Sequence, residues 1–370
     1  MTLLLNEEQT MLRDSARSFL AESAPVAQLR QLRDSADPAG FAGTTWSAFA
    51  DLGYAGVAIP EAQGGAGLGA VEIGVLMEQI GRHLSALPFL ASGVVAAQLL
   101  QRAGHAAQQS QWLPRIARGE VIATLAIDEG PKHKPDALAL RAKRRGDGWL
   151  LSGDKHFVPD GHVASLLLVA ARSADGVAVF AVPRDTAGLQ VERTEMADAH
   201  NAAVVRLRDV HLPESARLAG GDAALQQALD FGRAAAAAEL LGIADEVFER
   251  TLDYLKQRKQ FGRLIGEFQA LQHRAATLYV DIELARAALA KALHALDSAP
   301  AQAAEAVAIA KAKCGMAATL AVQEGVQMHG GMGMTDQLDF GLFMKRARVL
   351  QELYGDAGFH MDRLARMRGY

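Results

Sequence analysis

The sequence has one cysteine, no long apolar run and almost no excess charge, and each shortage excludes a class of protein. Cys314 is the single cysteine, so an internal disulfide and a cysteine-based zinc site are excluded. One thiol in a chain of this length is typical of a reducing compartment, and we expect a cytoplasmic protein. No stretch approaches the roughly 18 consecutive apolar residues of a membrane-spanning helix, so we expect no membrane span. The net charge of -4 gives no indication of nucleic acid or an anionic membrane as a partner.

Two motifs are present only as fragments. His329-Gly330-Gly331 also occurs in esterase oxyanion loops, but the G-x-S-x-G motif that must accompany it is missing from the chain. Gly65 to Ala70 matches G-x-G-x-x-A, a weak dinucleotide signal. No second parallel strand ending in an acidic residue follows it. This context argues against a dinucleotide-binding fold.

The hydrophobic pattern changes twice along the chain, which predicts three consecutive domains. Residues 1–120 have helical periodicity and begin with a helix capped by Asn6. Residues 222–370 contain long helical segments with short connections, which predicts a four-helix bundle. Residues 121–221 contain seven short β-prone runs and predict an antiparallel barrel or sandwich, so the fold class is α+β multidomain. The runs are Val121–Ile127, Leu138–Lys143, Trp149–Ser152, Leu166–Ala171, Val177–Val182, Leu189–Glu192 and Val204–Leu207.

Two segments of the predicted bundle carry the clearest functional signals. Residues 258–262 read Arg-Lys-Gln-Phe-Gly at a helix end, where an arginine can pair with a phosphate or complement the helix dipole. Residues 327–335 read Gln-Met-His-Gly-Gly-Met-Gly-Met-Thr between two helical stretches. One glycine suffices to end a helix, whereas this loop holds three, which favours close approach of a ligand to the backbone.

Together these two segments resemble the acyl-CoA dehydrogenase family of flavoproteins, and the resemblance extends over essentially the whole chain. It implies FAD as cofactor, an acyl-CoA substrate, an electron-transfer flavoprotein as electron acceptor, and a tetramer in which subunits share FAD sites. It also implies that residues 60–67 are a structural turn between N-terminal helices, and it implies which residues contact FAD. They are Arg258, Gln260, Phe261, Gln327, Gly330, Gly331, Phe157 and Val158.

The predicted β domain departs from the family pattern at two places. Relatives carry Thr-Glu-Pro-Gly-Ala-Gly-Ser in the loop that touches flavin and thioester, where this chain has residues 128–134, Asp-Glu-Gly-Pro-Lys-His-Lys, and keeps only Glu129. Relatives carry Trp-Ile-Thr beside the reactive flavin nitrogen, where this chain has Phe157-Val158-Pro159. Proline has neither N–H nor hydroxyl, so a hydrogen bond to the flavin is lost or supplied differently. Lys155 is kept.

The position of the family's catalytic glutamate is vacant. Residues 351–358 read Gln-Glu-Leu-Tyr-Gly-Asp-Ala-Gly, so the glutamate aligns with Tyr354 or Gly355. A second family position for the base aligns with Gly232. Asp356 is our candidate catalytic base, with a helix cap or turn as the alternative role. Glu239, on an apolar helix face, is interpreted as structural, as are His329 and His360.

Three hypotheses follow. The first is an FAD-dependent acyl-CoA dehydrogenase with Asp356 as base. The second is an FAD-holding, non-catalytic subunit of a heteromer whose partner supplies the base, because the Gly-Asp-Ala tail resembles small subunits of bacterial heteromeric acyl-CoA dehydrogenases of the pimeloyl-CoA dehydrogenase type. The third is a flavin oxidase or monooxygenase on the same fold, which Pro159 leaves open.

Overall fold

The computed structural model of the protein describes residues 4–370, which divide into two compact units. The first unit consists of residues 4–30, Ala70–Ser85 and Arg233–Tyr370, and the second of Gln31–Gly69 and Ala86–Gly232. Helices α2 (Val26–Asp34) and α7 (Gly221–Gln257) continue from one unit into the other. None of the helices formed by residues 4–370 combines the length and hydropathy of a membrane-spanning segment.

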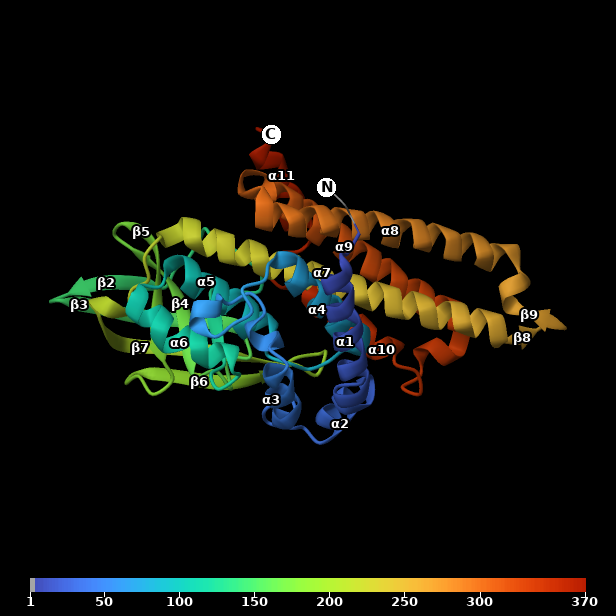
Figure 1. Cartoon of the computed structure of the whole chain (residues 1–370), viewed down its shortest axis with the longest axis horizontal. Helices are drawn as coiled ribbons and strands as arrows, with labels where there is room; N and C mark the ends of the chain where they lie inside the picture. The colour runs from blue at the N-terminus through green and yellow to red at the C-terminus, as the bar shows by residue number, and fades with distance from the viewer. Residues whose placement is uncertain (1–3) are drawn as a thin grey trace. The chain divides into compact units, whose positions relative to one another are not determined.

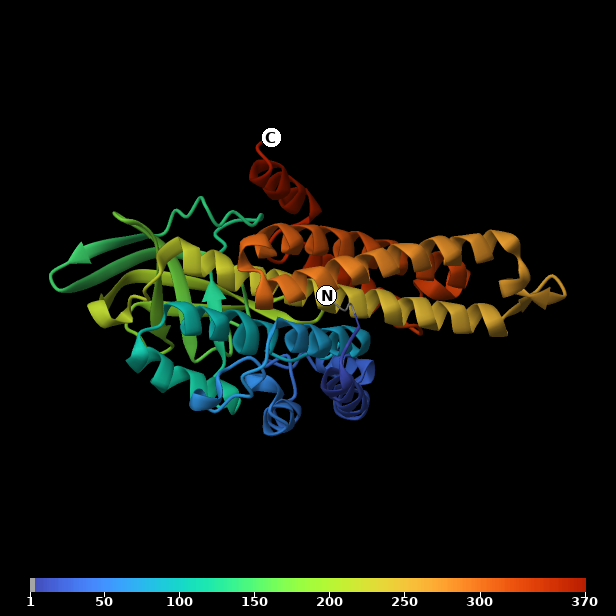
Figure 2. The same ribbon diagram turned by 45° about the horizontal axis from the view of Figure 1, so that its top comes forward.

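The first unit is helical, with one small hairpin (Figure 1). Its helices α8 and α9 run side by side along most of their length, and α11 packs against α9 and projects outward (Figure 2). Besides α7, the elements are α1 (Glu7–Ser23), α4 (Ala70–His83), β8 (Lys259–Gln260), β9 (Arg263–Leu264), η5 (Ile265–Glu267), α8 (Gln269–Ser298), α9 (Pro300–His329), η6 (Gly330–Met334), α10 (Phe340–Glu352) and α11 (Ala357–Met367).

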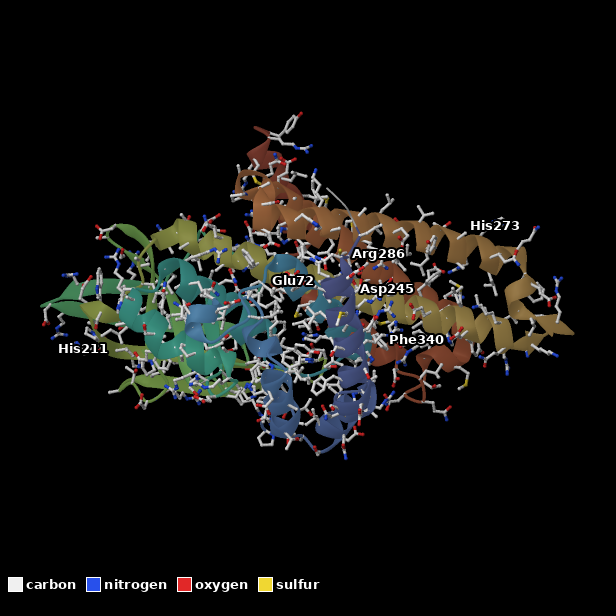
Figure 3. The ribbon with its side chains drawn as sticks, viewed as in Figure 1. Glu72, His211, Asp245, His273, Arg286 and Phe340 are labelled. Carbon is white, nitrogen blue, oxygen red and sulfur yellow. The ribbon has the colours of Figure 1, made fainter. Side chains whose placement is uncertain are left out.

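Helices α4 and α7 cross closely because each presents a glycine to the other's backbone. A Cβ atom added at Gly81 would lie 2.1 Å from the carbonyl oxygen of Glu239, and one added at Gly242 would lie 2.0 Å from that of Glu78. Charged side chains join these helices to α8, where Arg286 reaches Asp245 at 2.6 Å (Figure 3). The predicted cap of α1 is confirmed, since Asn6 accepts the N–H of Gln9 at 2.8 Å in a capping box.

The second unit combines short helices with a seven-stranded sheet of order β1-β4-β2-β3-β7-β6, in which β5 pairs with β4. All seven predicted strands are present, and the α+β fold class is confirmed. The strands are β1 (Ala123–Ala126), β2 (Arg141–Arg145), β3 (Gly148–Pro159), β4 (Leu166–Ser173), β5 (Gly176–Pro183), β6 (Leu189–Glu195) and β7 (Asn201–Pro213). The helical elements are α3 (Gly43–Asp51), η1 (Tyr54–Gly56), η2 (Glu61–Gln63), η3 (Leu90–Ala96), α5 (Ala97–Ala103), α6 (Ala106–Ala117) and η4 (Glu214–Ala216).

Three details differ from the sequence-based expectation. Strand β1 pairs with β4 in parallel, so the sheet is not purely antiparallel, because the β2–β3 hairpin lies between these strands in the chain. Within the region 1–120 that we expected to be helical, residues 88–119 form three separate elements, η3, α5 and α6, with Gly104 between the last two. Helix α11 is a fifth helix within residues 222–370, where we expected a bundle of four. Residues 60–67 form the structural turn we expected, and Gly65 packs against the carbonyl oxygens of Ile59 and Gly56.

Candidate functional site

Residues 258–264 form an exposed two-residue hairpin at the end of α7. Strands β8 and β9 are joined by Phe261 and Gly262, whose φ angles of +53° and +78° are those of a tight primed turn. Phe261 is 93% exposed although its side chain is aromatic, and its positive φ strains the backbone. Among residues 4–370, the side chain of Arg258 has no hydrogen bond or ion pair. An exposed aromatic ring and an unpaired guanidinium on one hairpin are well suited to bind a ligand that carries phosphate.

The loop after α9 is open at the two glycines that the sequence singled out. Gly330 ends α9 with a φ of +61°, and a Cβ atom added at Gly330 or Gly331 would meet no other atom within 4 Å. Gly331 has no positive φ, so the chain's own packing does not require glycine there. Gly333 differs, because its added Cβ would lie 2.6 Å from the carbonyl oxygen of Val326. The free space at Gly331 is what a cradle for an external phosphate requires.

Histidine 329, next to this loop, has a structural role. Its ring packs between Tyr254 and Phe340, at centroid distances of 4.2 and 4.3 Å. Its Nδ1 lies 2.7 Å from the carbonyl oxygen of Gly325, and burial lowers the pKa of the imidazole. The ring therefore holds α7, α9 and α10 together. Gln327, two residues earlier, is exposed.

Phe157 and Val158 lie at a bulge in β3. Lys155 pairs with Val205, and Val158 pairs with Ala203. An advance of three residues along β3 therefore corresponds to only two residues along β7. The extra residue reverses the alternation of side chains and places Val158 in the core. Phe157 has a φ of +50° and is 46% exposed. A strained, outward-facing aromatic residue next to a buried anchor marks a surface suited to ligand contact.

The turn between α10 and α11 buries Tyr354 and places Asp356 at a helix cap. Tyr354, at a φ of +58°, is 2% exposed, and a Cβ atom added at Gly355 would lie 2.3 Å from the ring of Phe359. Asp356 is half-buried and is the N-cap of α11, where its Oδ1 accepts the N–H of Phe359 at 2.8 Å. The cap role that we held open for Asp356 is thus the one its geometry satisfies.

Sequence reasoning missed two buried cations that fix this turn. Lys311, on α9, donates to the carbonyl oxygens of Leu350, Gln351 and Gly355 at 2.8, 3.1 and 3.0 Å. Burial, with the nearby charge of Arg233, lowers the pKa of Lys311 to about 7. Arg233 donates to the carbonyl oxygen of Tyr354 at 3.2 Å. A lysine inside an alanine-rich apolar run was the available signal, because a buried ammonium needs acceptors.

Glu239 is structural, as we interpreted it. It is 1% exposed on α7, and its Oε1 accepts a hydrogen bond of 2.6 Å from Nε of Arg346 on α10. A buried carboxylate paired with a guanidinium is poorly placed to take a proton from a substrate.

Comparison with known proteins decides the family. The family models for the N-terminal, middle and C-terminal domains of acyl-CoA dehydrogenase match residues 6–120, 126–210 and 219–368. Acyl-CoA dehydrogenase FadE12 of Mycobacterium tuberculosis is 31% identical over 363 residues, which cover 93% of this chain and 91% of that protein. The chain belongs to the acyl-CoA dehydrogenase family. The predicted family and enzyme class are thereby confirmed, and FAD is the cofactor that membership implies.

Two solved structures of this family are similar to the chain over its whole length. A variant of the Tcur3481-Tcur3483 steroid ACAD superposes with a TM-score of 0.91 at 35% identity, covering 99% of this chain and 98% of that one. The ChsE4-ChsE5 complex from Mycobacterium tuberculosis superposes with a TM-score of 0.92 at 26% identity, covering all of both chains. Both are described as pairs of different chains.

Proposed function

We propose that this acyl-CoA dehydrogenase chain is the FAD-holding subunit of a heteromer, and that a second chain of the same family supplies the catalytic base. The turn at residues 353–356 carries this proposal. Tyr354 is buried, Gly355 is closed off by Phe359, and Asp356 caps α11. The similarity to the ChsE4-ChsE5 complex, and to a second structure that is also named as a pair, supports it.

The open segments of the chain are the ones that would hold FAD. Arg258 would pair with the pyrophosphate, with Gln260 and Phe261 of the same hairpin beside it. The backbone at Gly330 and Gly331, next to Gln327, would cradle the adenosine-diphosphate end. Phe157 would face the flavin ring. The side chain of Val158 lies in the core, so this residue would contribute at most its backbone, contrary to the side-chain contact that the resemblance implied. The chemistry that FAD supplies when bound is acceptance of a hydride from the substrate's β-carbon, and an electron-transfer flavoprotein is the proposed external acceptor.

The test is an anaerobic titration of the flavin with acyl-CoA thioesters, beginning with thioesters of steroid side chains because one similar structure is of a steroid ACAD. We expect the isolated chain to show no bleaching of flavin absorbance, and the chain co-purified with a glutamate-bearing family member to bleach. Bleaching by the isolated chain would contradict the proposal. Oxygen consumption with peroxide release, without an external acceptor, would instead support the oxidase hypothesis.

Asp356→Asn separates the two candidate sources of the base. Asparagine keeps a side-chain oxygen for the N–H of Phe359, so the cap and the stability of α11 are retained. We expect the assembled enzyme to keep its activity within about threefold, since the proposed base lies in the partner. A loss of about a hundredfold or more in kcat, with unchanged FAD content, would restore Asp356 as the base.

Phe157→Gly tests the flavin contact. Glycine adopts the φ of +50° without strain, so the melting temperature of the FAD-free protein is expected to stay equal or rise. Loss of the aromatic contact is expected to raise the Kd for FAD about tenfold, equivalent to about 1.4 kcal/mol. Quenching of flavin fluorescence measures that Kd, and an unchanged value would remove Phe157 from the proposed site.

A further inference from the structure

Glu129 and Lys155 form an ion pair in the second unit. Glu129 lies in the loop between β1 and β2, and Lys155 lies on β3, two residues before Phe157. The Nζ of Lys155 donates to Glu129 Oε1 at 2.6 Å and to the carbonyl oxygen of Ile127 at 3.0 Å. The side chain of Lys155 is fully buried, whereas that of Glu129 is 17% exposed.

Glu129 also joins both ends of its loop. Its Oε2 accepts the N–H of Ala139 at 2.5 Å, and its Oε1 accepts that of Leu140 at 3.0 Å. Burial alone raises the pKa of Glu129, but the hydrogen bonds from Lys155 and from these two N–H groups hold it below its ordinary value. The carboxylate is therefore charged at neutral pH, and it connects residues 127–129, residues 139–140 and β3 at one point.

The same pair sets the geometry of the bulge. The N–H of His156, the residue after Lys155, donates to the carbonyl oxygen of Asp128 at 2.7 Å rather than to β7. With Lys155 anchored inward and His156 bonded to the loop, the ladder resumes only at Val158, and Phe157 takes its positive φ and faces outward. The loop in turn lines a cavity of about 260 Å³, together with Ile127 and Leu138.

We propose that Glu129 and Lys155 are a positioning pair, which holds the loop of residues 128–138 and the exposed ring of Phe157 in the arrangement that receives FAD. The inference rests on the proposed placement of FAD beside Phe157 and Val158. Neither side chain touches the cofactor itself. Their effect passes through the strained backbone of Phe157 and through the loop, whose displacement would weaken the contacts proposed for FAD there.

The test uses the assembled protein and the variants Lys155→Met, Glu129→Gln and the double variant. Each single variant is expected to raise the Kd for FAD about ten- to a hundredfold, to change the absorbance spectrum of bound flavin, and to speed amide exchange in peptides covering 128–140 and 155–158. Peptides covering 327–335, in the other unit, are expected to exchange as in the wild type. The double variant leaves no unpaired buried charge, so its loss in affinity is expected to be smaller than the sum of the single losses.

Asp154→Asn is the matched control. Asp154 precedes Lys155 on β3 but pairs with Arg208 at the surface, at 2.5 Å, so FAD affinity and loop exchange are expected to stay unchanged. If a single variant fails to fold, the double variant and the amide exchange rates of the loop test the inference instead. An unchanged Kd and spectrum in folded Lys155→Met or double-variant protein would overturn the inference. Wild-type protein that binds no FAD would contradict the proposed function instead, while faster loop exchange in the variants would still support the pair's role in holding the loop.

Discussion

Replacing Arg346 with methionine is expected to lower the free energy of unfolding by about 3–5 kcal/mol, the largest effect on stability that we foresee. The change leaves Glu239 in the core of the first unit with its carboxylate unpaired. An unpaired buried charge costs more than the pair contributes, because water no longer solvates it. Chemical unfolding followed by circular dichroism measures the decrease in the free energy of unfolding. Release of bound flavin reports whether the first unit unfolds in the same transition.

Arg348→Met is the control for this prediction. Arg348 lies two residues further along α10 and pairs with Glu352 at the surface, where its side chain is 69% exposed. Its loss is expected to cost about 0–1 kcal/mol. Glu239→Gln combined with Arg346→Met should recover part of the stability, since no charge remains buried. If Arg346→Met cost no more than Arg348→Met, the pair would not stabilise the bundle as described.

Gly331→Glu is expected to raise the Kd for FAD at least about a hundredfold, close to 3 kcal/mol, because a carboxylate would stand where the pyrophosphate is proposed to lie. The fold is expected to remain intact, since a Cβ atom at this position meets nothing within 4 Å and the backbone has no positive φ. The measurement is fluorescence titration with FAD, accompanied by the melting temperature of the FAD-free protein. High salt should recover part of the lost affinity, because a repulsion between exposed charges is screened.

Two substitutions serve as controls for Gly331→Glu. Gly331→Ala adds bulk without charge and is expected to weaken FAD binding much less than Gly331→Glu. Gly43→Glu adds the same charge at the start of α3 in the second unit, where the added Cβ also meets no atom within 4 Å. It is expected to leave the Kd unchanged. Equal effects of the two glutamates would mean that net charge, rather than a phosphate site at Gly331, determines the affinity.

Both predictions concern the first unit, and the proposed positioning pair concerns the second. This assignment to different units helps to identify why a variant binds FAD more weakly. A variant at Gly331 is expected to lose affinity without faster exchange in the loop of residues 128–138, whereas a variant at Lys155 is expected to lose affinity with faster exchange there. The two routes to a weaker Kd are therefore distinguishable in one set of measurements.

Secondary structure and family followed from patterns that are local in the chain. A strand alternates or accumulates β-branched residues within a few positions, and all seven were found. The long helices of the bundle have a helical periodicity of apolar residues, which can be recognised within each segment alone. The expectation was incomplete where tertiary contacts decide, as in the division of residues 88–119 and in helix α11, which begins at the cap formed by Asp356.

The parallel pairing of β1 with β4 is also decided by tertiary contacts. Nothing within either strand specifies its neighbour, because pairing depends on how the intervening β2–β3 hairpin folds back. The bulge at Phe157 was likewise invisible in the sequence, since it arises from the hydrogen bond between His156 and Asp128.

Sequence alone was sufficient for the chemistry class of this protein, because the residues that signal FAD lie in two short segments and keep their spacing. The vacancy at the position of the family's glutamate stays a prediction from the sequence. Only the tertiary structure assigned Tyr354 to the interior, Asp356 to a helix cap and Lys311 to the carbonyl groups of the turn. Glu239 and Arg346 are separated by 107 residues, and Glu129 and Lys155 by 26. The partner of a buried charge is set by how distant elements pack, which no local pattern encodes.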